Sequence, residues 1–134
     1  MAISLKGDRE ISSEPTTKSK ALRINLNSDI YGTFAEIGAG QETARNFFRS
    51  GGASGTIAKA MSAYDKDFSD AVYGGEEDGR YVTEDRLKKM LTYEIQLTED
   101  RLIRKNHPGK IFFSYANTVT TIDFAKNFKG HGWV

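Results

Sequence analysis

The sequence predicts an α/β or α+β domain with a small mixed sheet and about three covering helices. Two segments rich in apolar and β-branched residues, Ile30 to Ile37 and Ile111 to Ile122, are typical of strands. Between them, the apolar residues of Glu84 to Lys105 recur at helical spacing. Strands that alternate with helices favour a sheet with helices packed on it, either as a whole domain or as part of a larger fold.

Length and composition indicate a single domain and exclude several functions. The chain has 134 residues, 19 basic and 18 acidic, with a formal net charge of +1. We expect neither nucleic acid nor a membrane as a partner, because such a domain lacks a basic surface. The absence of cysteine and the presence of only two histidines argue against a metal site. No apolar run approaches the roughly 20 residues that span a bilayer, so we expect a cytoplasmic protein.

Residues 1–20 differ in composition from the rest of the chain. Every aromatic residue and all but one of the 13 glycines follow Lys20. The run from Ile11 to Lys20 is polar, contains Pro15 and shows no periodicity. We therefore expect a disordered or tag-like tail at residues 1–20 and a single α/β domain at residues 21–134.

A hairpin is predicted at the start of the domain. Apolar and polar residues alternate from Ala21 to Leu26, which predicts a half-buried strand. Asn27 to Asp29 are turn-forming residues, and Ile30 to Ile37 follows as a more buried strand.

A short helix is predicted from Gln41 to Ser50. Its inward-facing stripe would consist of Ala44, Phe47 and Phe48, and Gly51 would end it. The glycines between Gly38 and Gly40 would allow the sharp turn that leads into this helix.

The segment from Thr56 to Tyr73 has two interpretations. Its apolar residues recur at helical spacing, which favours a helix. The alternative is a strand from Thr56 to Tyr64 followed by a loop at Asp65 to Asp67. We favour the helix.

The C-terminal half contains the clearest elements. Thr83 is a suitable N-cap for the helix from Glu84 to Lys105, which Asn106 to Gly109 would end. The strand from Ile111 to Ile122 follows, and a further strand is expected around Trp133.

Several distinctive runs of the chain also occur together in known proteins. These runs are Ala21 to Leu26, Ile30 to Phe48, Gly51 to Asp65, Phe68 to Gly74, Tyr81-Val82, the long helix, Phe112 to Val119 and His131-Gly-Trp133. In this order they resemble the N-terminal region of a large uncharacterised bacterial protein family, over about Ala21 to Val134. Members of that family are several times longer, so the resemblance implies that this chain is the N-terminal portion of a longer protein.

Members of that family are variously named TonB-dependent receptor or nicotinamide mononucleotide adenylyltransferase. A receptor barrel needs an export signal and many alternating strands, whereas this sequence predicts a long amphipathic helix. The adenylyltransferases have a His/Thr-x-Gly-His motif after their first strand. The nearest string here, Phe128-Lys-Gly-His131, begins with the wrong residue and lies near the C-terminus. The resemblance therefore transfers no catalytic residue.

The segment Glu36-Ile-Gly-Ala-Gly40 lies between a predicted strand and a predicted helix, where backbone N–H groups can bind a phosphate or carboxylate. It resembles the glycine-rich first loop of adenosylmethionine-dependent methyltransferases. A dinucleotide-binding pattern would need glycine at Thr43. The alternative is that Gly38 and Gly40 only make a tight strand-to-helix connection.

A second glycine-rich loop runs from Gly51 to Gly55. It does not match a Walker A motif, because three residues separate Gly55 from Lys59. Ser54 and the backbone around Gly55 could still hold an anion; the alternative is a plain loop.

Acidic residues and histidines give weaker signals. Asp65, Asp67 and Asp70 are closely spaced but lack the pattern of a calcium loop, so a solvated face is expected. His107 is expected to be a turn residue. His131 is the more interesting histidine because it lies beside Trp133.

These patterns favour a module that binds an anionic or nucleotide-like small molecule at its glycine-rich loops. The candidate ligand-binding residues are Glu36, Gly38, Gly40, Ser54, Gly55 and His131. One alternative is a structural module that forms a homo-oligomer by burying an unfinished sheet edge against another copy. Another is part of an enzyme whose active site is completed by a further C-terminal region. Catalytic residues and cofactors stay unassigned.

Overall fold

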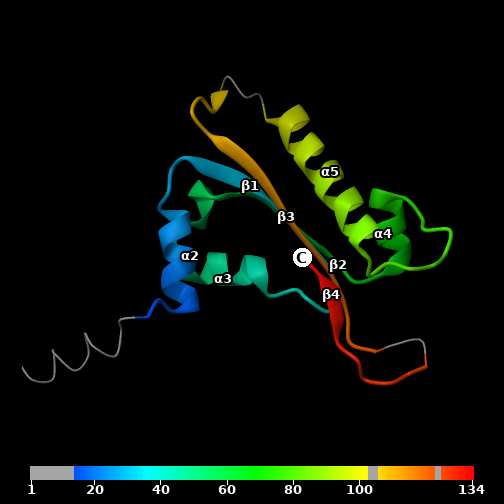
Figure 1. Ribbon diagram of the computed structural model, residues 1–134. Helices are drawn as coiled ribbons and strands as arrows, with labels where there is room; N and C mark the ends of the chain where they lie inside the picture. The colour runs from blue at the N-terminus through cyan, green and yellow to red at the C-terminus, as the bar shows by residue number, and fades with distance from the viewer. Residues whose placement is uncertain (1–13, 103–105, 123–124) are drawn as a thin grey trace, which may run out of the picture.

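The computed structural model describes residues 14–102, 106–122 and 125–134 (Figure 1). The elements are α2 (Thr17–Asn25), β1 (Ile30–Gly38), α3 (Thr43–Ser50), the 3-10 helix η1 (Ala53–Gly55), β2 (Ile57–Ala63), α4 (Lys66–Tyr73), α5 (Glu84–Arg101), β3 (Ile111–Thr120) and β4 (His131–Trp133). Over these residues a mixed four-stranded sheet combines with four α-helices. This confirms the α/β class.

The strands lie in the order β2-β1-β3-β4. Strand β1 is parallel to both of its neighbours, and its pairing with β3 runs from Ile30 opposite Ile111 to Gly38 opposite Val119. Strand β4 is antiparallel to β3. The carboxyl ends of β1, β2 and β3 therefore meet at one edge of the sheet.

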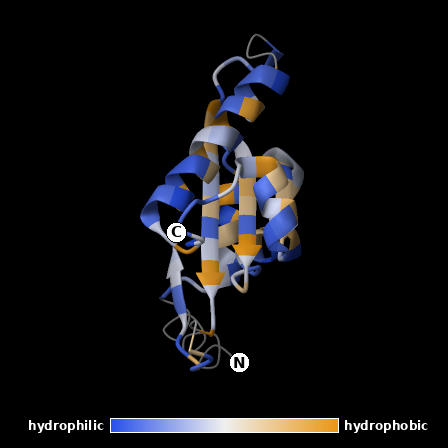
Figure 2. Ribbon diagram, turned by 90° about the vertical axis from the view of Figure 1, so that its right-hand side faces the viewer, coloured by the Kyte–Doolittle hydropathy of each residue, from blue (hydrophilic) through white to orange (hydrophobic). Residues whose placement is uncertain are grey.

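Helices cover both faces of the sheet. Helix α5 packs along β3 and β1 on one face, and α2 packs against α3 on the other (Figure 1). The ring centroids of Phe34 and Phe47 are 5.1 Å apart, which fixes α3 against β1. Figure 2 shows hydrophobic residues on the central strands and hydrophilic residues along the outer parts of the helices. No helix in the described part of the chain combines the length and apolar character needed to cross a membrane.

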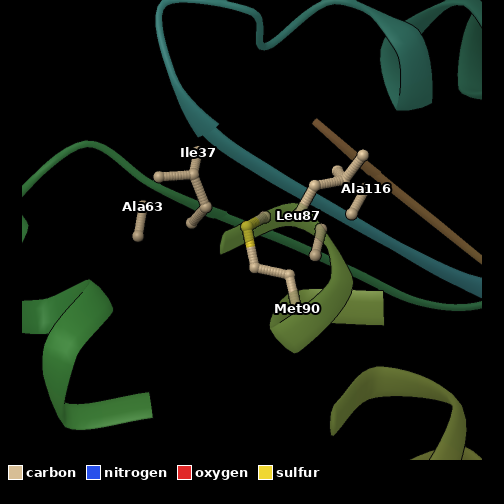
Figure 3. Packing of buried hydrophobic residues seen from close by; sticks show 6 residues of the cluster. Ile37, Ala63, Leu87, Met90 and Ala116 are labelled. Carbon is tan, nitrogen blue, oxygen red and sulfur yellow. The ribbon is translucent and has the colours of Figure 1, made fainter. Parts of the chain in front are cut away.

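The main hydrophobic core lies between the sheet and α5 (Figure 3). Its buried members are Ala35, Ile37, Ala63, Leu87, Met90 and Ala116. Small alanines on the strands leave room for the larger side chains of the helix, so α5 can approach the sheet closely.

The predicted first strand, Ala21 to Leu26, is wrong, and so is the hairpin, because this segment belongs to α2. The side chain of Thr16 accepts a hydrogen bond from the Ser19 amide at 3.1 Å and begins the helix. Ala21 and Asn25, four residues apart, are the buried positions. The apolar residues of the supposed alternation face solvent instead, and α2 includes residues 17–20 of the expected tail. Residues 1–13 lie outside the described residues.

The predicted helix over Thr56 to Tyr73 is also wrong. The strand of the alternative is confirmed by β2, whereas its loop at Asp65 to Asp67 is wrong, because α4 begins at Lys66. The carboxylate of Asp65 accepts a hydrogen bond from the Phe68 amide at 3.0 Å, so this residue caps α4. A short strand followed at once by a short helix gave a combined spacing that imitates one long helix.

The remaining elements were predicted with small differences at their ends. Helix α3 begins at Thr43 and ends before Gly51, whose φ is +82°, but Phe48 is exposed and not part of the inward stripe. Thr83 caps α5 as expected, and the helix ends at Arg101; Lys105 lies outside the described residues. Strand β3 ends at Thr120, and β4 supplies the expected strand near Trp133.

Candidate functional site

A cleft of about 910 Å³ lies at the carboxyl edge of the parallel strands. Its walls come from the ends of β1 and β3, the connection from β2 to α4, the segment before α5, and the start of β4. The connections from β1 to β2 and from β2 to β3 run over opposite faces of the sheet. Open α/β sheets bind ligands at the carboxyl edge where connections diverge in this way.

Gly38 shapes the cleft at the end of β1. Its φ is +80°, and a Cβ at this position would lie 2.2 Å from the Val119 carbonyl oxygen. The next amide, that of Ala39, donates a hydrogen bond to the same oxygen at 3.0 Å. Only glycine allows the backbone to turn this close to β3.

Basic side chains outnumber acidic ones in the lining. Lys66, Arg80 and Lys129 lie there with one acidic residue, Asp65. Lys66 donates a hydrogen bond to Asp70 at 2.9 Å, which holds the pKa of the Asp70 carboxyl below its usual range. Arg80 and Lys129 form no ion pair within the described part of the chain. The lining therefore carries two positive charges that no described carboxylate neutralises by direct pairing.

His131 ties β4 to the wall of the cleft. Its Nε2 lies 3.2 Å from the Val82 carbonyl oxygen. The hydroxyl of Thr118 on β3 donates to the carbonyl of Tyr81 at 2.8 Å. The segment that leads into α5 is thus fixed to two strands, and the cleft has a defined shape before any ligand arrives.

Arg86 holds the same wall from inside the protein. Its side chain is 1 % exposed and lies between α4 and the loop that follows it. It donates hydrogen bonds to the Gly74 carbonyl at 2.6 Å and to the Ser69 hydroxyl at 3.0 Å. Its guanidinium carbon lies 4.8 Å from the ring centre of Tyr81. The carboxylate of Glu76 accepts a further hydrogen bond from Arg86 Nη1 at 3.4 Å. This arginine connects the cleft wall to α5.

Glu36 lies on the opposite face of the sheet, at the amino end of α3. It is 4 % exposed, and its Oε1 accepts hydrogen bonds from the Thr43 amide at 2.8 Å and from Asn117 Nδ2 at 3.1 Å. Asn117 also donates to the Gly40 carbonyl at 2.7 Å. A carboxylate of the chain itself therefore occupies the helix end where the sequence suggested an external anion.

The other predicted binding residues are divided between two edges of the sheet. Gly38 and His131 line the cleft, and Glu36 and Gly40 lie beside it on the α3 face. Ser54 and Gly55 belong to η1, which precedes β2 and lies at the opposite edge (Figure 1). The six candidates thus do not form one site.

Sequence reasoning missed the main basic residues of the cleft. The sequence patterns assign a binding role to neither Arg80 nor Lys129. Only their positions in the sequence could have indicated this role, because Lys129 closely precedes β4 and Arg80 closely precedes α5. His107 stacks on Tyr31 with ring centroids 5.6 Å apart, away from the cleft. Within the described ranges, no three His, Cys, Asp or Glu side chains are placed to hold a metal ion.

A second buried polar cluster joins α4, α5 and β2. Glu94 is fully buried; it accepts a hydrogen bond from the Tyr73 hydroxyl at 2.6 Å and forms an ion pair with Lys59. Burial and the contact with the Glu94 carboxylate raise the pKa of Tyr73 above its usual range. This cluster lies outside the cleft lining and connects α4 and β2 to α5.

The raised pKa of Tyr73 predicts a pH-dependent effect of Tyr73→Phe. Near neutral pH, the variant should lose about 1–3 kcal/mol of unfolding free energy, because Glu94 loses a donor. Above about pH 10, the unfolded chain releases the Tyr73 proton that the folded protein retains, which lowers the stability of the wild type; the variant lacks this contribution. Urea unfolding near pH 7 and near pH 11 should therefore show that the gap in unfolding free energy between wild type and variant narrows at high pH. A constant gap would contradict this account.

Fold and site together define an open α/β domain with a basic cleft at the carboxyl edge of its parallel strands. No protein-family model, curated protein or solved structure matches this chain. Its function must therefore be inferred from the geometry of the cleft.

Proposed function

We propose that the domain binds a small anionic, nucleotide-like ligand in the cleft at the carboxyl edge of its sheet. The observation that carries this proposal is the combination of an open cleft of about 910 Å³ with the side chains of Arg80 and Lys129 in its lining, neither of which pairs with a carboxylate of the described residues. Charge-assisted hydrogen bonds to such groups are the strong polar contacts of anion sites. His131 adds a ring nitrogen to the same lining.

The positions of α4 and α5 also support a negatively charged ligand. Both α4 and α5 begin at the cleft, where Lys66 and Thr83 are lining residues. The amino end of a helix carries a partial positive charge, so two helices contribute to a field that attracts an anion. Asp65 offsets part of this field, because its carboxylate caps α4.

The apolar part of the lining supports a ligand larger than phosphate. It includes Tyr64, Val82 and Ile122. A volume of about 910 Å³ is at the upper end of the range for small-molecule sites. A ligand with an anionic end and a less polar body, as in a nucleotide, uses both kinds of surface.

Calorimetric titration of the purified protein with adenosine monophosphate and with inorganic phosphate tests this proposal. We expect both to bind, the nucleotide more tightly. Arg80→Ala and Lys129→Ala should each weaken binding about tenfold, the loss of one charge-assisted hydrogen bond. Arg45→Ala is the matched control, because Arg45 is exposed on α3, outside the cleft lining, and should leave affinity unchanged. Absence of heat and of thermal stabilisation at millimolar ligand, or equal loss in all three variants, would overturn the proposal.

A further inference from the structure

Strand β2 has an unpaired edge. It forms one side of the sheet and pairs with β1 alone among the described strands. The register of the pairing with β1 shifts between Gly32 and Thr33, so Ala58 forms a bulge. After it, Lys59 to Ala63 pair regularly with β1. The backbone N–H and C=O groups along the outer side of this stretch are a template for a further strand.

The sequence of β2 lacks the devices that protect most edge strands. It contains no proline and one charged residue, Lys59. The ammonium group of Lys59 is paired with the buried Glu94 carboxylate, so it does not prevent another strand from pairing with this edge. Ala60 and Ser62 are exposed and small, which permits close approach of another backbone.

Charges at the two ends of β2 favour an antiparallel partner with the same sequence. Arg49, in the last turn of α3, lies towards the start of β2, because η1 leads directly from α3 into the strand. Asp65 and Asp67 lie just past its end, where Lys66 is bonded to Asp70. Two antiparallel copies bring the basic end of one strand to the acidic end of the other, whereas parallel copies oppose like charges.

We propose that two copies of this chain associate through β2, which pairs antiparallel with the β2 strand of the second copy about a two-fold axis. The two sheets then become one continuous sheet. The interface is isologous, since the same residues contribute from both copies. The proposal does not depend on the proposed ligand, because the cleft lies at the end of the strands rather than along the free side of β2; of the charged residues named at the two ends of β2, Arg49 and Asp67 lie outside the cleft lining.

Sedimentation velocity over a concentration series tests this proposal. We expect the wild type to form dimers and Ala60→Lys to weaken association about tenfold or more, because it places two lysines close together at the paired strands. Thr92→Lys is the matched control, since Thr92 is exposed on α5 and should leave the dimer intact. A wild type that is monomeric throughout, or equal association of both variants, would overturn the proposal.

Charge exchange tests the antiparallel arrangement without altering the strand. Arg49→Glu and Asp67→Lys should each weaken the dimer, and the double variant should recover association, because it restores opposite charges across the interface. Circular dichroism establishes that each variant is folded. Additive weakening in the double variant would overturn the antiparallel pairing.

Discussion

Replacement of Arg86 by alanine should lower the unfolding free energy by about 3–5 kcal/mol, the usual cost of removing one partner from a buried charged network. The guanidinium group is almost fully buried and donates to Gly74 and Ser69 while lying near Asp70. Its loss leaves these acceptors without a donor and opens a cavity beside α5. The segment that forms one wall of the cleft should loosen at the same time.

Urea unfolding at neutral pH measures this effect, and Lys88→Ala is the matched control. Lys88 lies on the same helix and forms an exposed ion pair with Glu84. Such pairs contribute about 0–1 kcal/mol, so the control should unfold almost as the wild type does. If Arg86→Ala destabilised no more than Lys88→Ala, the proposed role of Arg86 in holding the cleft wall would be wrong.

Gly38→Ala should destabilise the protein by about 2–5 kcal/mol, because it combines an unfavourable backbone conformation with a steric clash. The φ of +80° disfavours any side chain, and the new Cβ would lie 2.2 Å from the Val119 carbonyl oxygen. Relief of that contact requires the ends of β1 and β3 to separate. The carboxyl edge of the sheet, where the cleft lies, would therefore change shape.

Gly51→Ala separates the two causes. Gly51 has a nearly equal φ of +82°, but a Cβ there would meet nothing within 4 Å. This variant should lose only the conformational share, about 1–2 kcal/mol, because a side chain at positive φ is unfavourable. Thermal and urea unfolding of the two variants should therefore differ clearly. Equal destabilisation would show that the close approach to Val119 adds nothing.

The elements that the sequence predicted correctly are those whose local signals agree. The long helix has a capping threonine at Thr83, acidic residues in its first turn and an extended amphipathic pattern. Strands β1 and β3 are rich in residues that favour buried sheet, and Gly38 combines a strand end with a turn. Each of these features depends on neighbours in the sequence.

The errors arose where the deciding contacts are distant or the pattern is short. Six alternating residues predicted a strand, whereas Thr16 and the buried contacts of Asn25 with the end of α3 specify α2. Helical spacing over Ile57 to Tyr73 arose from a strand and a helix placed end to end. Local pattern alone does not resolve such cases, because tertiary packing decides them.

The candidate site could be predicted only in part for the same reason. The cleft lining comes from segments widely separated in the chain, and their meeting follows from the strand order. Glu36 was singled out because it stands before a glycine turn, yet its partners Thr43 and Asn117 make it an internal cap. Positions that follow strand ends were the better guide to the cleft than the glycine motifs themselves.

Amide chemical-shift mapping during titration with adenosine monophosphate tests the central claim most directly. The indole N–H of Trp133, the only tryptophan, gives one resolved reporter on β4. We predict that the shifts concentrate at Gly38, at Arg80 to Val82, at Thr118 to Thr121 and at Lys129 to His131. Shifts confined to the loop from Gly51 to Gly55, or none at saturating ligand, would contradict a binding site at the carboxyl edge of the sheet.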